Sequence, residues 1–337
     1  MRLLALISLA LACALSVVPP ARASGCAPAT DVNLYSGCLA SHVNWGKRYP
    51  DRTIGLAAGA HTVGVTASTA LAGAIASVRL DGRELIASGG HGSALQYAFH
   101  AHGLGECWNP TEAGSDRDDA GGWPQFHGPS TSRLFGFGGG PTSLSSSSRL
   151  AMYVAPGSRS SWDGCAPSYP AGFPFENGLS PYLLSKNVSV AAGAGGAALI
   201  RFDAGVQVLA PEQSSTFDSL LIVYLAPRFD HYWQLNPATG ALTPLTLGGH
   251  TSLAPIVAST ADGREAVGMW SGAAAGTFAL TYYLGYQPGT GAYPFQSHTV
   301  QTTWWGRDLR PGRYRYRSAY AVGSLREVAR TLVSLGR

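Results

Sequence analysis

Short apolar segments alternate with glycine, proline and polar residues along most of the chain. Several of these segments are rich in β-branched and aromatic residues, which is typical of strands. The pattern therefore predicts an all-β fold, a large antiparallel β-sandwich with long loops. The expected strands outside the hairpins are 198–202, 206–210, 220–226, 255–259, 277–286 and 314–322.

Two Asp-Gly pairs predict hairpins within this fold. Asp81-Gly82 separates two β-prone runs, and both residues tolerate the positive φ angles that a tight type I′ turn requires. Asp262-Gly263 repeats the pattern later in the chain. We therefore expect strand pairs on either side of each Asp-Gly.

One short helix is predicted at the C-terminus. Ser324 and Glu327 form a capping box, in which each side chain satisfies a free backbone amide of the other. An apolar stripe follows, made of Leu325, Val328, Leu332 and Leu335. We expect this helix to pack on a sheet and to have a structural role.

Apolar periodicity almost disappears over residues 89–181. The segment holds glycine, proline and serine runs such as GFGGGPTSLSSSS, yet it also carries two cysteines and three tryptophans, which argue against a disordered linker. We interpret 89–181 as a loop-rich insertion that forms one face of a single β-sandwich domain spanning 24–337.

Residues 1–23 predict a secretory signal peptide. An apolar run over 3–18 precedes Ala23, which completes a small-x-small cleavage site. Cys13 leaves a lipoprotein as the alternative. We expect the mature chain to be secreted or periplasmic and to contain no transmembrane segment, because no second apolar stretch is long enough to cross a bilayer.

The mature chain would hold four cysteines, an even number that suggests two disulfides in an exported protein. Four cysteines allow three connectivities, and spacing does not decide between them. Nearest-neighbour pairing is our preferred arrangement, which joins Cys26 to Cys38 and Cys107 to Cys165.

Net charge gives little support for a polyanionic partner. The formal charge of +4 becomes +2 once Arg2 and Arg22 leave with the signal peptide. We expect no nucleic acid partner. The segment 306–317, GRDLRPGRYRYR, holds five arginines, which we interpret as the solvated face of an alternating strand.

Residues 105–119, GECWNPTEAGSDRDD, concentrate five of the nineteen carboxylates. Glu112 and Glu106 are our leading catalytic candidates, with Asp116 third. Pro110 and Gly114 predict a turn, which can bring two carboxyls within the ~5–9.5 Å that glycoside hydrolysis uses. Burial beside Trp108 would raise the pKa of one carboxyl, as an acid catalyst requires.

A metal offers a different interpretation of the same acidic run. Asp116, Asp118 and Asp119 present hard oxygen ligands that suit calcium, but the loop glycine and distant glutamate of an EF-hand are missing. His100 and His102 have a spacing compatible with zinc, without a third ligand at diagnostic spacing. We expect no metal and no cofactor, with calcium as the alternative.

Other side chains near the acidic run could bind a sugar. Aromatic rings can stack on the apolar faces of sugar rings, while amides and imidazoles hydrogen-bond to hydroxyls. About half of the aromatic residues would instead be buried packing residues. The candidate substrate-binding residues are His91, Gln96, Tyr97, Trp108, Asn109, Trp123 and His127.

Residues 73–82, followed by Ile86, Gly89-Gly90-His91-Gly92 and Leu95-Gln96, resemble the opening strands of galactose-mutarotase-like β-supersandwich proteins, which include aldose epimerases and domains of glycoside hydrolases and polysaccharide lyases. The resemblance implies a sugar-binding sandwich. An epimerase would also need an Asn-His segment, which is absent, and a late glutamate base, for which Glu265 and Glu327 are the available residues. Locally, GECWNPTEAG resembles a motif of exported bacterial sandwich proteins of unknown reaction.

We therefore predict an exported carbohydrate-active enzyme, a glycoside hydrolase acting on a poly- or oligosaccharide. A non-catalytic glycan-binding envelope protein is the alternative from another class. A polysaccharide lyase is the third hypothesis. It would need a base such as Tyr97 or His127 and a group such as Arg133 or Arg313 to neutralise a uronate.

Overall fold

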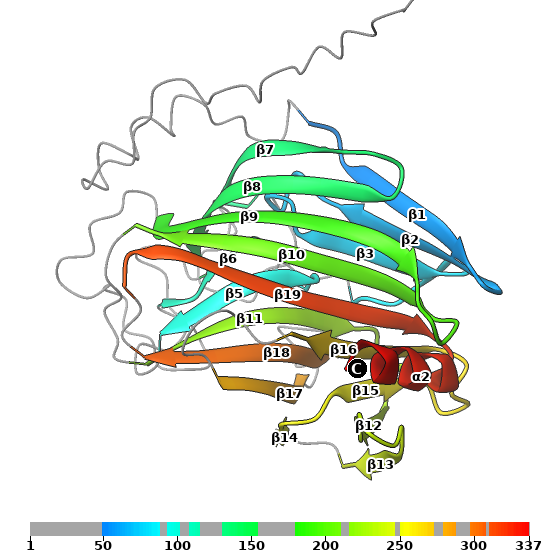
Figure 1. The fold of residues 1–337 in the computed structure, drawn as a ribbon. Coiled ribbons are helices and arrows are strands. Elements are labelled where there is room, and N and C mark those ends of the chain that lie inside the picture. The colour runs from blue at the N-terminus through cyan, green and yellow to red at the C-terminus, as the bar shows by residue number, and fades with distance from the viewer. Residues whose placement is uncertain are drawn as a thin grey trace, which may run out of the picture.

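Antiparallel strands arranged in two sheets make up most of the protein, with one helix near the C-terminus (Figure 1). This computed structural model describes residues 49–87, 93–101, 108–114, 130–153, 179–209, 216–246, 250–272, 279–287, 297–307 and 310–336. The all-β sandwich predicted from the sequence is confirmed. The signal peptide, Cys26 and Cys38 lie outside the described residues.

The smaller sheet is a meander at the start of the described chain. Its strands follow one another as β1 (Arg52–Ala58), β2 (His61–Ala67), β3 (Ile75–Leu80) and β4 (Arg83–Glu84). Asp81 and Gly82 connect β3 to β4 with φ angles of 51° and 81°. Positive φ at both positions is the signature of a type I′ turn, so the first predicted hairpin is confirmed.

The larger sheet contains fifteen strands in the described residues. In chain order they are β5 (Gln96–Ala101), β6 (Pro110–Thr111), β7 (Arg133–Gly139), β8 (Ser143–Met152), β9 (Leu179–Ala192), β10 (Ala198–Val208), β11 (Thr216–Leu225), β12 (His231–Leu235), β13 (Leu242–Leu245), β14 (His250–Ser252), β15 (Ile256–Ser259), β16 (Ala266–Ser271), β17 (Ala279–Gln287), β18 (Ser297–Arg307) and β19 (Gly312–Gly323). Their spatial order is β13-β12-β15-β16-β19-β10-β9-β8-β6-β5-β11-β18-β17-β14, and β7 pairs with β8.

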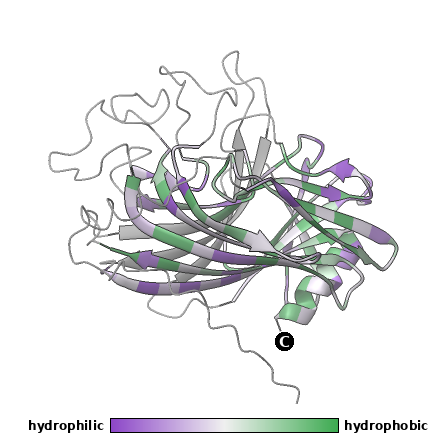
Figure 2. Ribbon diagram, turned by 90° about the horizontal axis from the view of Figure 1, so that it is seen from above, coloured by the Kyte–Doolittle hydropathy of each residue, from purple (hydrophilic) through white to green (hydrophobic). Residues whose placement is uncertain are grey.

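Alternation of buried and exposed positions explains the central strands. In β10, Phe202, Ala204 and Val206 are buried while Arg201 and Asp203 are exposed. Because this alternation continues without a break, the two strands predicted on either side of Asp203 form one strand. Figure 2 shows hydrophilic and hydrophobic residues alternating along the strands in the same way.

The main hydrophobic core lies between the sheets. Ile54 and Val65 of the small sheet enter it together with Tyr97 of β5, Val188 of β9 and Val206 of β10. Side chains from strands far apart in the sequence thus share one interior, and removal of their apolar surface from water is the main term that holds the sandwich together.

Helix α2 (Leu325–Leu335) covers one end of the large sheet (Figure 1). The predicted capping box is present: Ser324 N–H donates to Glu327 Oε2 at 2.9 Å, and the Ser324 side chain accepts from Glu327 N–H. Val328 and Leu332 pack against β16 over Gly268, where an added Cβ would lie 2.5 Å from the Val328 side chain. This close approach requires glycine.

The predicted loop-rich insertion needs a correction, because its described residues include strands β5 to β8. Residues 133–152, which we interpreted as irregular, form a hairpin of two strands. Serine hides the alternation in β8: Ser145 and Ser147 face outward, and Ser146 and Ser148 face inward and are buried. Pattern analysis by hydrophobicity therefore finds no period there.

Candidate functional site

The central part of the acidic segment, residues 108–114, is held between two strands of the large sheet. Thr111 pairs with Ala98 of β5 and with Ala151 of β8. Gly114 N–H then donates to the Thr111 carbonyl at 3.2 Å, and Gly114 has a φ of 57°. The turn expected from Pro110 and Gly114 is thus present.

Two serines fasten this turn. Ser130 Oγ donates to the Glu112 carbonyl at 3.0 Å, and Ser132 Oγ donates to the Thr111 carbonyl at 2.6 Å. Ser132 Oγ also accepts from Ala151 N–H at 2.7 Å. Because every one of these groups is buried, the bonds replace solvent contacts and make the segment a rigid part of the interior.

Glu112 forms an ion pair with Lys186 inside the sandwich. Lys186 Nζ lies 2.5 Å from Glu112 Oε1, and both side chains are 0% exposed. The other carboxylate oxygen, Oε2, accepts from Tyr97 N–H at 2.9 Å. Both oxygens of the carboxylate are therefore bound by protein groups.

Burial and pairing act on the two charges in opposite directions. Burial raises the pKa of the Glu112 carboxyl above its ordinary value, and the Lys186 charge opposes this rise. Burial likewise lowers the pKa of the Lys186 ammonium, and Glu112 opposes that fall. Each charge therefore depends on the other for its stability in the interior.

Tyr97 lies beside this pair on the inner face of β5. Its ring packs against Phe202 at 6.4 Å and against Tyr316 at 6.4 Å between centroids. Burial raises the pKa of the Tyr97 phenol well above its ordinary range, the charge of Glu112 adds to this rise, and Ser318 opposes it. A tyrosinate base at Tyr97 is disfavoured by this environment.

The remaining described candidates surround the same segment. Gln96 is 3% exposed and its Oε1 accepts from Ala113 N–H at 2.9 Å. Trp108 is 1% exposed, and the carbonyl of half-buried Asn109 accepts from Tyr153 N–H. The structure therefore brings Gln96, Tyr97, Trp108, Asn109 and Glu112 together, but in the interior rather than on an open cleft.

Several predicted site residues cannot be placed against this group. The candidates that lie outside the described residues are Glu106, Asp116, Asp118, Asp119, His91, Trp123, His127, Cys107 and Cys165. The catalytic, calcium and disulfide assignments that depend on them stay predictions.

Lys186 is the residue that pattern analysis missed. It lies in β9 between Leu184 and Val188, on the buried side of the alternation. The chain has only two lysines, Lys47 and Lys186. A lysine in phase with the buried apolar positions of a strand was therefore a signal that a buried partner carboxylate should exist.

The two late glutamates considered for an epimerase base have other partners. Glu265 accepts from Arg228 and pairs with Arg83, each at 2.6 Å. Glu327 caps α2, and its Oε2 lies 3.0 Å from His61 Nε2.

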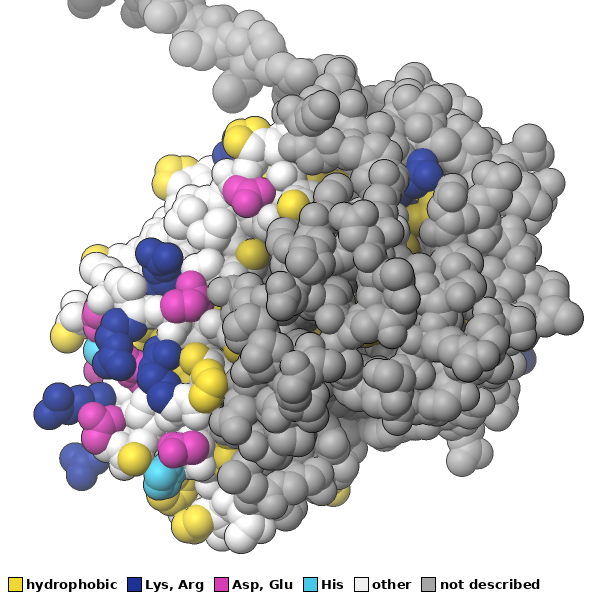
Figure 3. Space-filling model, turned by 180° about the vertical axis from the view of Figure 1, so that it is seen from behind, with side chains coloured by type: hydrophobic (Ala, Val, Ile, Leu, Met, Phe, Trp, Pro, Cys, Tyr) yellow, Lys and Arg dark blue, Asp and Glu magenta, His cyan; other side chains and the backbone are white. Residues whose placement is uncertain are grey.

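On the face turned away from Figure 1, basic and acidic side chains lie side by side in the described region (Figure 3).

The described part of the chain contains neither a candidate metal cluster nor a membrane-spanning helix. None of its His, Cys, Asp and Glu side chains form a group of three or more that could hold a metal ion. None of its helices is both long enough and apolar enough to cross a membrane.

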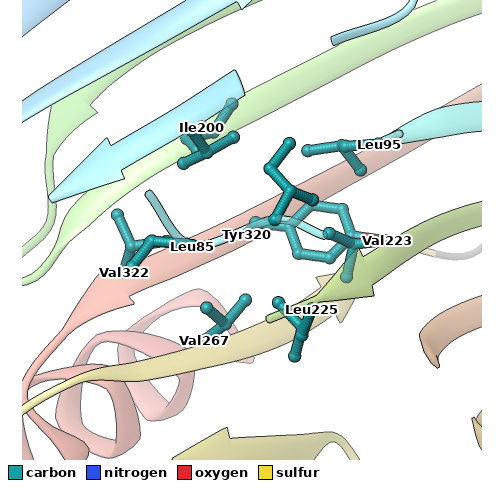
Figure 4. A pocket seen from close by; sticks show the side chains of 10 residues that line it. Leu85, Leu95, Ile200, Val223, Leu225, Val267, Tyr320 and Val322 are labelled. Atoms are coloured by element: carbon teal, nitrogen blue, oxygen red, sulfur yellow. The ribbon is translucent and has the colours of Figure 1, made fainter. Parts of the chain in front are cut away.

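An apolar cavity of about 10 Å³ lies in the main core (Figure 4). Leu85, Ile200 and Val223 line it together with Tyr320, and their side chains point toward one another in the figure. A cavity this small, without polar partners, is at the lower limit for a single water molecule. It is a packing gap and not a substrate site.

Comparisons with known proteins do not assign the chain to a family. No family model and no curated protein sequence matches it. Heparan sulfate lyase from Pedobacter heparinus is similar in structure, with a TM-score of 0.41 and 7% identity over 86% of this chain and 39% of that one. The 4-alpha-glucanotransferase from Thermococcus litoralis has a TM-score of 0.39 and 8% identity, over 82% and 39%.

An aldose epimerase homologue from C. elegans is similar with a TM-score of 0.36 and 9% identity, over 81% of this chain and 99% of that one. The chain thus spans 39% of the length of the lyase and of the glucanotransferase. All three TM-scores are below 0.5.

Proposed function

We propose that the protein is an exported carbohydrate-active enzyme, a glycoside hydrolase, whose site is built on the rigid segment 108–114. The observation that supports this is the fully buried Glu112–Lys186 pair. Buried ion pairs seldom add net stability over well-packed apolar residues, so their presence calls for another explanation. Strongly perturbed charges concentrate at functional sites, which favours a role in the site.

Glu112 has a positioning role in this proposal. Its two carboxylate oxygens are bound by Lys186 and by the Tyr97 amide, and its side chain has no exposed surface. It therefore does not touch the substrate in this arrangement. It fixes segment 108–114 against β5 and β9, which a catalytic constellation needs to hold its geometry.

The acid and the nucleophile or base are then Glu106 and Asp116. Each lies two residues along the sequence from an end of segment 108–114, whose described residues are fixed against β5 and β8. Glycoside hydrolysis needs one protonated and one ionised carboxyl about 5–9.5 Å apart. Half-buried Asn109, three residues from Glu106, would contribute to sugar binding, whereas Trp108 is 1% exposed and packs in the interior.

Sugar release tests this assignment. The mature protein is incubated with a panel of bacterial and plant polysaccharides, and reducing ends are measured. Glu106→Gln and Asp116→Asn should each lower kcat/KM by about 100- to 10,000-fold. Asp230→Asn, an exposed carboxylate that pairs with its neighbour His231 among the described residues, is the control and should retain full activity.

A second measurement separates positioning from general folding. Glu112→Gln should lower kcat while KM for the same polysaccharide stays close to that of the parent, at a temperature well below the Tm of both proteins. Binding of a polysaccharide without any sugar release would overturn the hydrolase and favour a glycan-binding protein. Equal turnover by Glu106→Gln, Asp116→Asn and the parent would remove both catalytic assignments.

A further inference from the structure

The outer face of the large sheet carries a row of arginines on β19. Arg313, Arg315 and Arg317 are exposed and alternate with Tyr314 and Tyr316, whose side chains are partly or fully buried. Because every second residue of a strand faces the same side, the three guanidinium groups leave one face about 7 Å apart. The sequence prediction of a solvated arginine face is confirmed for these three residues.

The neighbouring strand adds little opposing charge to this row. Arg317 lies opposite Asp203 of β10, Arg313 opposite Gln207, and Arg201 is exposed two residues from Asp203. Four arginines and one aspartate give this face a charge of +4 − 1 = +3. Elsewhere in the described residues arginines such as Arg83 and Arg228 are paired with Glu265, whereas no arginine of this row enters a described ion pair.

Small polar residues continue from the arginine row across the sheet. Arg315 lies opposite Gly205, which is followed in register by Ser185 of β9, Ser147 of β8 and Gly136 of β7. The Ser147 and Ser185 hydroxyls are 3.2 Å apart and exposed. Strands are spaced by about 4.8 Å, so this line is about 19 Å long.

Longer polar side chains border the line. Asn187 of β9 and Asp203 of β10 are the next outward-facing residues on one side of the line. Gln207 of β10 is the next outward-facing residue on the other side. The surface therefore combines a shallow line of small residues with hydroxyl, amide and carboxylate groups along its edges and cations at its end. Figure 1 shows β8, β9, β10 and β19 side by side, with α2 near one end of them.

The same face is apolar where the helix covers it. Ala319 and Ala321, the next outward positions of β19 after Arg317, are buried beneath α2 with Leu199 of β10. The change from alanine to arginine along one strand thus marks the boundary between the part that packs a helix and the part that meets solvent. The arginine part is a surface in its own right.

We propose that this surface, made by the outward residues of β8, β9, β10 and β19, binds an acidic polysaccharide. Guanidinium groups bind carboxylate or sulfate groups through paired hydrogen bonds, and repeated anions along an extended chain match a row of arginines. Serine, asparagine and glutamine suit the hydroxyl groups of the same ligand. Single-stranded nucleic acid binding would need aromatic side chains for base stacking along the row, and the β10 residues in register with the three arginines are Gly205, Asp203 and Gln207 instead.

Binding to polygalacturonate tests the proposal, with dextran as the uncharged comparison. The mature protein should bind polygalacturonate and lose affinity as salt is raised, whereas dextran should bind at least about tenfold more weakly. The triple variant R313Q/R315Q/R317Q should weaken binding about tenfold, since each exposed guanidinium group contributes only a modest part of the affinity.

The triple variant R264Q/R326Q/R330Q provides a matched control, because it removes the same charge from exposed arginines on a turn and on α2. It should bind like the parent, and all proteins should keep the parent Tm. Equal losses in both triple variants, equal binding of dextran, or tighter binding of single-stranded DNA at the same salt would each overturn the proposal. Binding is measured without turnover, so it can fail while the hydrolase assignment holds, and the reverse.

Discussion

Lys186 Nζ contacts Glu112 Oε1 at 2.5 Å across the interior of the sandwich, joining β9 to the turn that follows β6. The pair connects residues that are 74 positions apart in the sequence. Neither charge has any solvent contact, so removal of one partner leaves the other without compensation.

We expect single substitutions in this pair to be far more damaging than the double one. Lys186→Met should lower the free energy of unfolding by about 3–5 kcal/mol, because it leaves a buried carboxylate unpaired. The double variant Lys186→Met with Glu112→Leu should recover most of this loss. Urea unfolding of the four proteins gives the coupling energy.

The ion-pair assignment would be contradicted if the double variant lost as much free energy of unfolding as the two single variants together, or more. Glu112→Gln is a further check, because its amide keeps the shape of the carboxylate and can still accept from Tyr97 N–H. Its loss of stability should therefore come mainly from the uncompensated Lys186 cation.

A second prediction concerns pH and the contact between the small sheet and α2. His61 Nδ1 lies 2.7 Å from Asp81 Oδ2, and its Nε2 lies 3.0 Å from Glu327 Oε2. The hydrogen bond to Asp81 raises the pKa of His61 above its ordinary 6.5, with a further contribution from Glu327, while partial burial opposes the rise. The stabilisation by the protonated ring is therefore complete below 6.5 and is lost as the pH rises through the raised pKa.

The carboxylates behave in the opposite sense. The pKa values of Asp81 and Glu327 are lowered, so their contribution is present above their ordinary values of 3.8 and 4.5 and is lost as the pH falls through the lowered ones. His61→Gln should therefore reduce stability at about pH 5.5 more than at about pH 9. Thermal unfolding at both pH values measures this, and an equal reduction at both would refute it.

The sequence predicted elements whose signals are local. The Asp81-Gly82 turn depends on the φ preferences of two residues, and the α2 cap depends on Ser324 and Glu327, three positions apart. Both are present because neighbouring residues alone determine them. Strand β10 was predicted as two strands because Asp203 and Gly205 interrupt the local run of apolar residues.

Features that depend on distant residues were not predictable in this way. Glu112 was predicted as a catalytic candidate from its place in the acidic segment 105–119, but its partner Lys186 belongs to β9, a strand that the hydrophobic pattern did not predict. The hairpin of β7 and β8 was missed because buried Ser146 and Ser148 replace the apolar residues that mark a strand.

A third prediction uses the apolar cavity of about 10 Å³ in the main core. Val267→Ile adds one methyl group beside this gap, so we expect a change in the free energy of unfolding below about 1 kcal/mol. Val188, also in the core, does not line the cavity and provides the matched control. Val188→Ile should cost about 1–3 kcal/mol through overpacking, and equal losses in urea unfolding would contradict the cavity's position.

The last prediction tests how tightly the turn of segment 108–114 is held. Gly114 has a φ of 57°, and an added Cβ would lie 2.8 Å from Ser130 Oγ and from the Ser132 backbone nitrogen. Gly114→Ala should therefore combine backbone strain with a steric clash and lower stability by about 2–4 kcal/mol. Gly82→Ala is the control, because Gly82 has a φ of 81° but no atom within 4 Å of the added Cβ.

Gly82→Ala should show the strain contribution alone, of about 1 kcal/mol. The difference between the two variants in urea unfolding then measures the packing of the turn against Ser130 and Ser132. If both variants lost the same stability, the serine contacts would not constrain the turn. Segment 108–114 could then not serve as the rigid support that positions Glu106 and Asp116.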